Sequence, residues 1–273
     1  MDIGYLLFNT IIYGCCALVL SGFFSYGNIL NFSLGSTMMM SGYLLFFLIK
    51  NGFTAVNLAM LVLLLISFFG INYLLFHCFE SDKKREHAGL IITLGVSLFL
   101  ENLTNYVYGS TAVSLPTGKI PLWMLIGGFL VLLGLLFFFH KKTFQGKLFQ
   151  AISENGNLIR ALGIKRAKVV QLFFAFFFVL IVLMSWVLLY HSSMRMQDGL
   201  FYMIKGMGIM ILVGLARKEY LFLGALLYVL TEYLLFVNLG LPIAYKESLI
   251  LIVIVLVLLI KPQGLFSLRK RSL

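Results

Sequence analysis

Long apolar segments, separated by short polar stretches, dominate this 273-residue chain. A bilayer crossing needs about 20 consecutive apolar residues. Backbone inside a bilayer must satisfy its own hydrogen bonds, which favours helices. The chain contains nine apolar segments of about this kind, near residues 3–24, 29–49, 53–76, 88–108, 120–140, 169–190, 200–215, 219–237 and 248–260. We therefore expect an all-α, polytopic membrane protein of about eight to nine transmembrane or re-entrant helices, forming one transmembrane domain over residues 1–273.

The composition supports this class and excludes others. Hydrophobic residues make up 61% of the chain and charged residues only 11%, whereas soluble domains have about 25% charged residues. The formal net charge of +11 does not indicate nucleic-acid binding, because the basic residues lie in short loops beside the apolar segments. The three cysteines have no spacing typical of a disulfide or a metal site, so we expect no bound metal.

The basic loops predict how the chain is oriented. Residues 78–87 include three consecutive basic residues, and residues 141–168 include seven, so both loops are expected on the cytoplasmic side. Loops 109–119 and 191–199 carry one basic residue each and are expected outside. Alternation then places the N-terminus outside and the C-terminus in the cytoplasm.

Two of the nine segments are less regular than the others. Segment 29–49 is interrupted by small and polar residues, and segment 200–215 is short. Either one could be a broken or re-entrant helix, since irregular backbone at membrane depth is tolerated against protein or a water-filled cavity.

The stretch 141–168 is the only long polar stretch of the chain. Its apolar residues Phe144, Leu148 and Ile152 are spaced four apart, which places them on one face of a helix. One interpretation is an amphipathic element that docks a cytoplasmic partner. The alternative is a solvated basic loop lying on anionic lipid headgroups.

Four motifs along the chain resemble those of one transporter family. They are Asn31-Phe32-Ser33-Leu34-Gly35, Ile91 to Ser97, Arg160-Ala161-Leu162-Gly163-Ile164, and the ending Lys261-Pro262-Gln263-Gly264-Leu265-Phe266. In this order, they resemble motifs of the inner-membrane permease subunits of branched-chain amino acid ABC importers. Bulky residues between Gly206 and Gly224 depart from the small-residue pattern of that family, so the chain looks like a divergent member.

The resemblance implies a set of partners. It implies cytoplasmic ATP-binding subunits, a second permease that is identical or related, and an external solute-binding protein, in a bacterial inner membrane. The chain itself has no Gly-x-x-x-x-Gly-Lys-Ser/Thr phosphate-binding motif, so ATP would be used by the partner subunit, with no cofactor on this chain and no enzymatic activity of its own. ATPase coupling is expected within the 141–168 loop, at Glu154, Arg160, Ala161, Gly163 and Ile164.

Ionisable residues inside apolar segments are the first candidates for the substrate path. Such groups are costly in a bilayer and mark function by default. Glu101, Lys205 and Glu232 qualify, and either glutamate could pair with Lys205. The alternative is that they form structural ion pairs or extend to the interface.

Small and polar residues in segment 29–49 complete the candidate path. Asn31, Ser33, Gly35 and Thr37 form a polar, small-residue face. This face is typical either of a broken helix whose N–H groups bind a polar solute or of a close-packed helix interface.

The favoured function is therefore the permease subunit of an ABC importer. Its solute would be a small polar molecule, such as a branched-chain or other amino acid, an amide or urea. The alternative is an ion-coupled secondary transporter or channel that uses Glu101, Lys205 and Glu232. A membrane-embedded enzyme is disfavoured, because the sequence shows no clustered His/Asp or Ser/His set.

Overall fold

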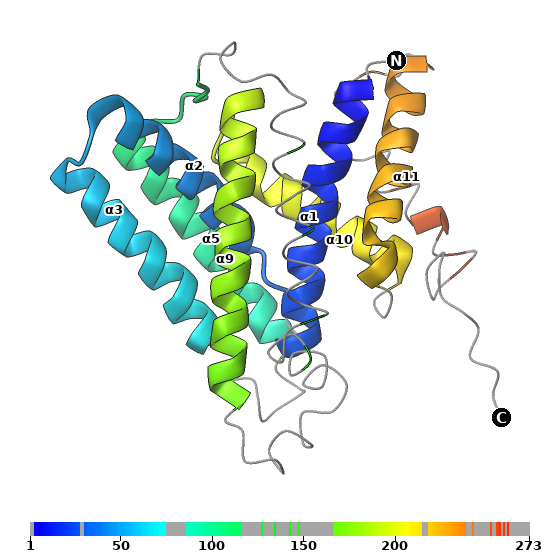
Figure 1. Cartoon of the computed structure of the whole chain (residues 1–273), viewed down its shortest axis with the longest axis horizontal. Coiled ribbons are helices and arrows are strands. Elements are labelled where there is room, and N and C mark those ends of the chain that lie inside the picture. The colour runs from blue at the N-terminus through cyan, green and yellow to red at the C-terminus, as the bar shows by residue number, and fades with distance from the viewer. Residues whose placement is uncertain are drawn as a thin grey trace. The chain divides into compact units, whose positions relative to one another are not determined.

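The computed structural model describes residues 3–27, 30–74, 86–115, 166–214 and 218–238, and isolated positions between 127 and 147 and between 242 and 261. This part of the chain is nearly all helical, and five of its helices are long and apolar enough to cross a membrane. The principal helices are α1 (Ile3–Gly27), α2 (Ser33–Asn51), α3 (Ala55–Leu65), α5 (Glu86–Tyr108), α9 (Arg166–His191), α10 (Asp198–Val213) and α11 (Leu221–Tyr233) (Figure 1). This is the make-up of a multi-pass membrane protein.

The chain divides into two compact units. The first unit consists of Met1–Gly22 and Phe201–Leu273, and the second of Phe23–Leu200. The first unit therefore joins the two ends of the chain, with most of α1, α10 and α11. The second unit contains α2, α3, α5 and α9. The expectation of one continuous domain stays a prediction.

The helix bounds agree closely with the apolar segments where both are described. Segment 88–108 is α5, and segment 53–76 is α3 continued by a π-helical turn (Ile66–Gly70) up to Leu74. For segment 29–49, a broken or re-entrant helix was one possibility. Helix α2 runs without interruption from Ser33 to Asn51, so there is no break over these residues, and the course of the segment through the membrane stays a prediction. Segments 120–140 and 248–260 lie outside the described residues, apart from isolated positions.

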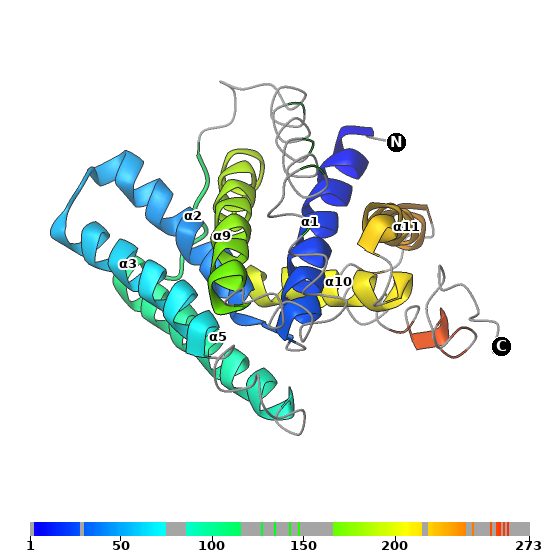
Figure 2. The same cartoon turned by 60° about the horizontal axis from the view of Figure 1, so that its bottom comes forward.

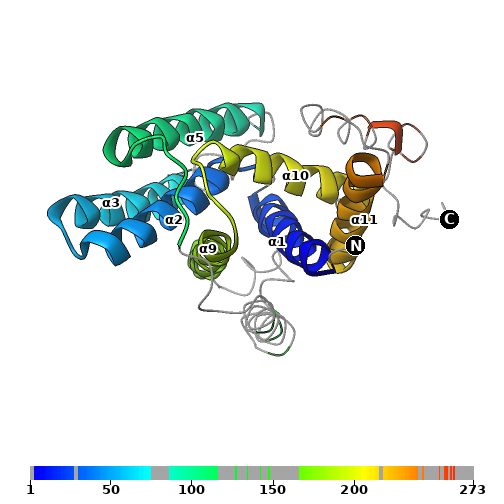
Figure 3. The same ribbon diagram turned by 90° about the horizontal axis from the view of Figure 1, so that it is seen from above.

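Helix α2 is the centre of the second unit. It packs against α3, α5 and α9, and every residue from Ser33 to Leu44 is buried. Figure 3 shows α2 lying between α9 and the pair formed by α3 and α5. A helix covered on several sides needs small residues, because they let neighbouring backbones approach closely.

Three connections meet at one end of the second unit. The loop after α5 pairs with the loop after α9, through two hydrogen bonds of 3.0 and 2.9 Å between the backbones of Val113 and Met194. The Tyr43 hydroxyl donates to the Thr111 carbonyl at 2.8 Å. In the first turn of α3, Asn57 accepts a hydrogen bond of 3.0 Å from the Tyr108 hydroxyl at the end of α5. The C-terminal ends of α2, α5 and α9 are thus tied together.

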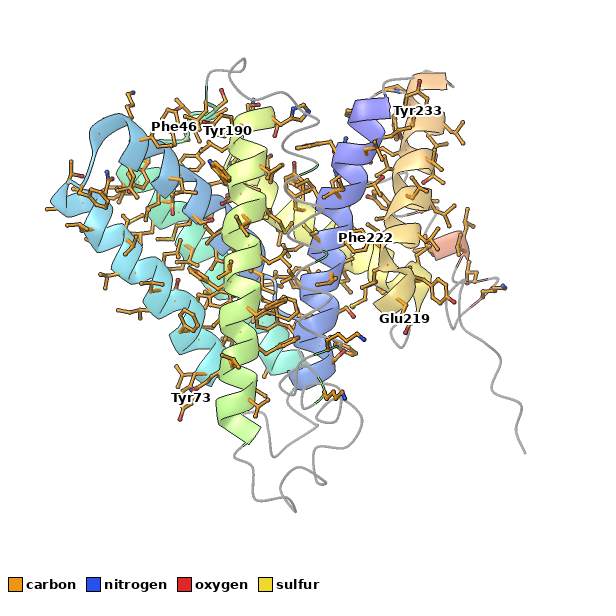
Figure 4. All side chains as sticks on the ribbon, in the orientation of Figure 1. Phe46, Tyr73, Tyr190, Glu219, Phe222 and Tyr233 are labelled. Carbon is orange, nitrogen blue, oxygen red and sulfur yellow. The ribbon has the colours of Figure 1, made fainter. Side chains whose placement is uncertain are left out.

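The outer faces of α3 and α5 are apolar and exposed. Figure 2 shows these helices running side by side at the edge of the second unit, and Figure 4 shows side chains projecting from them. Large apolar residues on these faces are exposed, among them Val62, Ile66, Ile91 and Phe99. Exposed apolar faces of this length are expected where lipid tails replace water around the helices.

The first unit is held together by close helix contacts. Gly206 of α10 lies directly against α1, so that a Cβ atom there would lie 2.9 Å from the backbone carbon of Cys16. A Cβ atom on Gly14 of α1 would lie 2.7 Å from the ring of Phe222 on α11 (Figure 4). The two glycines allow α10 and α11 to approach α1, and this approach positions the residues of the candidate site.

Candidate functional site

The candidate site is centred on Lys205 of α10. Its side chain is only 8% exposed, although it carries an ammonium group inside an apolar helix. The ammonium nitrogen lies 3.2 Å from the hydroxyl oxygen of Tyr13 on α1, to which it donates a hydrogen bond. The same nitrogen lies 4.9 Å from the centroid of the Tyr13 ring, within the range of a cation–π interaction. Tyr13 therefore contacts this charge both through its hydroxyl and through its ring.

Two further tyrosines adjoin Tyr13. The ring of Tyr202, one turn before Lys205 on α10, lies 5.9 Å from the Tyr13 ring, centroid to centroid. The ring of Tyr228 on α11 lies 5.7 Å away and meets it edge-on, at 86°. Helical residues three or four apart share a face, so Tyr202 and Lys205 project together from α10.

Glu232 adds a negative charge to this group. It follows Tyr228 by four residues on α11, so the two side chains lie on one helix face. Its side chain is 3% exposed, and it interacts electrostatically with Tyr13. We call Tyr13, Tyr202, Tyr228 and Glu232 the tyrosine cluster. Within this cluster Tyr13 contacts the Lys205 ammonium, and the rings of Tyr202 and Tyr228 pack against Tyr13.

The arrangement can hold a positive charge away from water. A charge in an apolar surrounding is strongly disfavoured unless it has partners. Aromatic faces, a hydroxyl acceptor and a carboxylate are all partners of a cation. Among the described residues, no group of three or more His, Cys, Asp or Glu side chains could hold a metal ion. The contacts shown at this site are those of an ammonium group with one hydroxyl oxygen and one ring face, both from Tyr13.

The small-residue face of α2 lies in the second unit and contacts other helices there. The amide oxygen of Asn31 accepts hydrogen bonds from the Ser33 backbone N–H at 3.0 Å and from the Ser33 hydroxyl at 2.6 Å. The Asn31 amide nitrogen donates to Asn72 at 2.7 Å. Asn31 thus satisfies an N–H group at the start of α2 and ties this helix end to the segment after α3.

Thr37 of this face, and the serines Ser36 and Ser41 of the same helix, make hydrogen bonds between and within helices. Ser36 is hydrogen-bonded to Ser97 of α5, and Ser41 donates to Ser185 of α9 at 2.7 Å. The Thr37 hydroxyl donates to a carbonyl of its own helix, that of Leu34, at 2.8 Å. These contacts are those of a close-packed helix interface.

Gly35 lies where two helix backbones meet. A Cβ atom on Gly199, the second residue of α10, would lie 2.5 Å from the carbonyl oxygen of Gly35. The whole contact belongs to the second unit, because Gly199 precedes the boundary at Leu200. Gly35 is therefore placed in a packing contact.

The remaining predicted site residues are distributed differently. Glu101 lies on α5 in the second unit and is partly exposed. The proposed coupling loop 141–168 lies largely outside the described residues. All of its predicted coupling residues are among those left undescribed, namely Glu154, Arg160, Ala161, Gly163 and Ile164.

Sequence reasoning missed Tyr13 as a site residue. Tyr13 and Lys205 are 192 positions apart, so no local pattern connects them. One feature of the sequence could have indicated it, namely a row of polar residues along one face of the first apolar segment. Asn9, Thr10 and Tyr13 lie at helical spacing in a segment that is otherwise apolar, and all three are buried.

Comparisons with known protein families, with curated proteins and with solved structures found no match for this chain.

Proposed function

We propose that this chain is a membrane transport subunit, and that it acts as the permease of an ATP-driven importer. The observation that carries the proposal is the buried Lys205 with its tyrosine cluster. A bilayer protein retains a buried charge at considerable cost, and such residues commonly line pathways for ions and polar solutes. Replacing a whole buried charged pair by apolar residues of similar volume is often neutral or stabilising, so packing alone does not require a lysine here.

Two features of the sequence support ATP as the source of energy. Four motifs in order resemble ABC importer permeases, and residues 141–168 form a basic, amphipathic stretch suited to docking a cytoplasmic ATPase. In this proposal the ATP-binding subunits, a second permease and an external binding protein complete the importer. The solute is a small polar molecule such as an amino acid, an amide or urea, in a bacterial inner membrane.

The proposed orientation has support from the second unit. Loops 109–119 and 191–199 both have few basic residues and were assigned to the outside independently. Val113 and Met194, one from each loop, are hydrogen-bonded to each other. Loops that lie on the same side of a membrane can make such a contact, whereas loops on opposite sides cannot. The contact supports a common side for these two loops. The basic loops 78–87 and 141–168 assign that side to the outside, with the N-terminus outside and the C-terminus inside.

Co-purification tests the proposal most directly. The chain is extracted from its native host in mild detergent, and the associated proteins are identified by mass spectrometry. We expect an ATP-binding subunit at about one copy per permease, lost when residues 150–164 are scrambled. Scrambling residues 266–273, a second basic stretch, is the matched control and should leave the ATPase bound. Recovery of the chain alone, or only with itself, would overturn the ATP-driven assignment.

The alternative is an ion-coupled secondary transporter, and the Lys205 site also favours it. Lys205 and Glu232 are buried ionisable groups, and groups of this kind serve ion coupling in many membrane proteins. Reconstitution in liposomes separates the two functions. Solute uptake that follows an imposed ion gradient and needs no ATPase would establish the alternative, with Glu101 as the next residue to test.

A further inference from the structure

The tyrosine cluster has the composition of a receptor for a cation. Tyr13 presents both its ring face and its hydroxyl to the ammonium nitrogen, at 4.9 Å from the ring centroid and 3.2 Å from the oxygen. Glu232 supplies a buried carboxyl group on α11. Aromatic faces attract ammonium groups through their quadrupole, most strongly when the site is desolvated. Here the bound ammonium group belongs to the chain itself.

We propose that the tyrosine cluster is an ammonium-binding site whose resident occupant is the Lys205 side chain, and that a primary alkylammonium group from solution occupies the same position when Lys205 leaves it. The amino group of a transported solute is the natural ligand of this kind. That link to a solute rests on the proposed function, whereas the binding chemistry does not.

The contacts of the Lys205 nitrogen decide which kind of group can take its place. An incoming carboxylate would be attracted to the Lys205 ammonium and would pair with it, so it would not displace it. The Tyr13 hydroxyl accepts a hydrogen bond from this nitrogen and the Tyr13 ring lies beside it, and both contacts suit a cation. A primary ammonium needs only to reproduce the contacts of the lysine nitrogen, with the same charge and the same three N–H donors.

The surrounding helices make exchange of the occupant feasible. Lysine carries its charge on a flexible four-carbon chain, so the ammonium can leave while the helix backbone stays in place. The backbone is fixed nearby by the contact of Gly206 with α1. Thr10, one turn before Tyr13, has a buried hydroxyl that makes no hydrogen bond within the described part of the chain.

Replacement of the resident side chain by a free amine tests the proposal. Lys205→Ala removes three methylene groups and the ammonium, which together correspond to propylammonium. Thermal unfolding of the detergent-solubilised variant is measured with about 50 mM propylammonium chloride and with the same concentration of sodium chloride. We expect propylammonium to raise the unfolding midpoint of Lys205→Ala by about 3 °C or more relative to sodium. An equal midpoint in the two salts would overturn the proposal.

Matched controls separate ammonium recognition from filling of a cavity. Lys205→Met keeps most of the side-chain volume, so the position is occupied and propylammonium should produce no shift. Propanol has a similar shape without the charge and should not stabilise Lys205→Ala. Glu232→Gln in the Lys205→Ala background should abolish the response to propylammonium. A propanol effect as large as that of propylammonium would show a simple apolar cavity and overturn the proposal.

A measurement on the Lys205-containing chain covers the case in which Lys205→Ala does not fold. Reductive methylation of lysines is followed by mass spectrometry, with the exposed Lys50 as the internal reference. We expect Lys205 to react at least tenfold more slowly than Lys50, and Tyr13→Phe to speed its reaction severalfold. An unchanged rate in Tyr13→Phe would overturn the proposal. None of these assays uses an ATPase, so their failure and the failure of the transport proposal are separate results.

Discussion

Gly199→Ala tests whether the small-residue face of α2 is a packed interface. The new Cβ atom would lie 2.5 Å from the carbonyl oxygen and 2.7 Å from the carbonyl carbon of Gly35, and 3.0 Å from Cγ of Met39. Ordinary carbon–oxygen contacts are more than 3 Å, so the backbone around Gly199 would have to move away from α2 by roughly half an ångström. The atoms in the way are backbone, and they cannot rotate aside as a side chain would.

The magnitude follows from two opposing terms. Overpacking of a close contact costs about 1–3 kcal/mol, and alanine in a helix gains at most about 1 kcal/mol over glycine. Because the clash involves backbone, we expect a net loss of about 1–2 kcal/mol in the free energy of unfolding. For a chain of this size that corresponds to a fall of about 2–8 °C in the unfolding midpoint.

The assay is thermal unfolding of the purified chain in detergent, followed by circular dichroism. Gly95→Ala is the matched control, because Gly95 lies inside α5 with no atom within 4 Å of its new Cβ. That control should be neutral or stabilising by up to about 1 kcal/mol. If Gly199→Ala unfolded at the same temperature as the unsubstituted chain, the backbone contact would be refuted, and Gly35 would become available to line a path.

Three further predictions concern the remaining site residues. Asn31→Ala should lower the free energy of unfolding by about 2–4 kcal/mol, because it removes the acceptor of the Ser33 hydrogen bonds and leaves the buried Asn72 amide oxygen without its Asn31 donor. Asn102→Ala, at an exposed position, should change this free energy by less than about 0.5 kcal/mol in the same unfolding assay. Lys205→Met should impair folding or solute uptake, measured by yield of inserted protein and by flux in liposomes, and an unaffected protein would show that the lysine has no role at this position. Gly163→Pro should leave the chain inserted but uncouple ATP hydrolysis from uptake in the reconstituted importer, and normal uptake would contradict the coupling-loop hypothesis.

Much of the helical architecture could be predicted from the sequence. Apolar runs of sufficient length must form helices in a bilayer, whatever their neighbours. This is why segment 88–108 corresponds so closely to α5. The start of α2 is also local information, since Asn31 accepts the N–H of Ser33 two residues later. Of the two interpretations left open for segment 29–49, a broken helix or a close-packed interface, the contacts of α2 favour the second, because its polar residues form hydrogen bonds within α2 and with neighbouring helices.

Tertiary structure decided the contents of the candidate site. The apolar character of α1 is evident in the sequence, but the contact between Tyr13 and Lys205 depends on how α1 and α10 pack. Gly95 and Gly199 are the same residue type in helices, yet one has open space at its Cβ and the other meets the backbone of Gly35. Helix formation depends on nearby residues and the surrounding solvent, whereas helix packing depends on side chains far apart in the chain. The sequence therefore determined which segments are helices, and only the packing determined which of their residues meet.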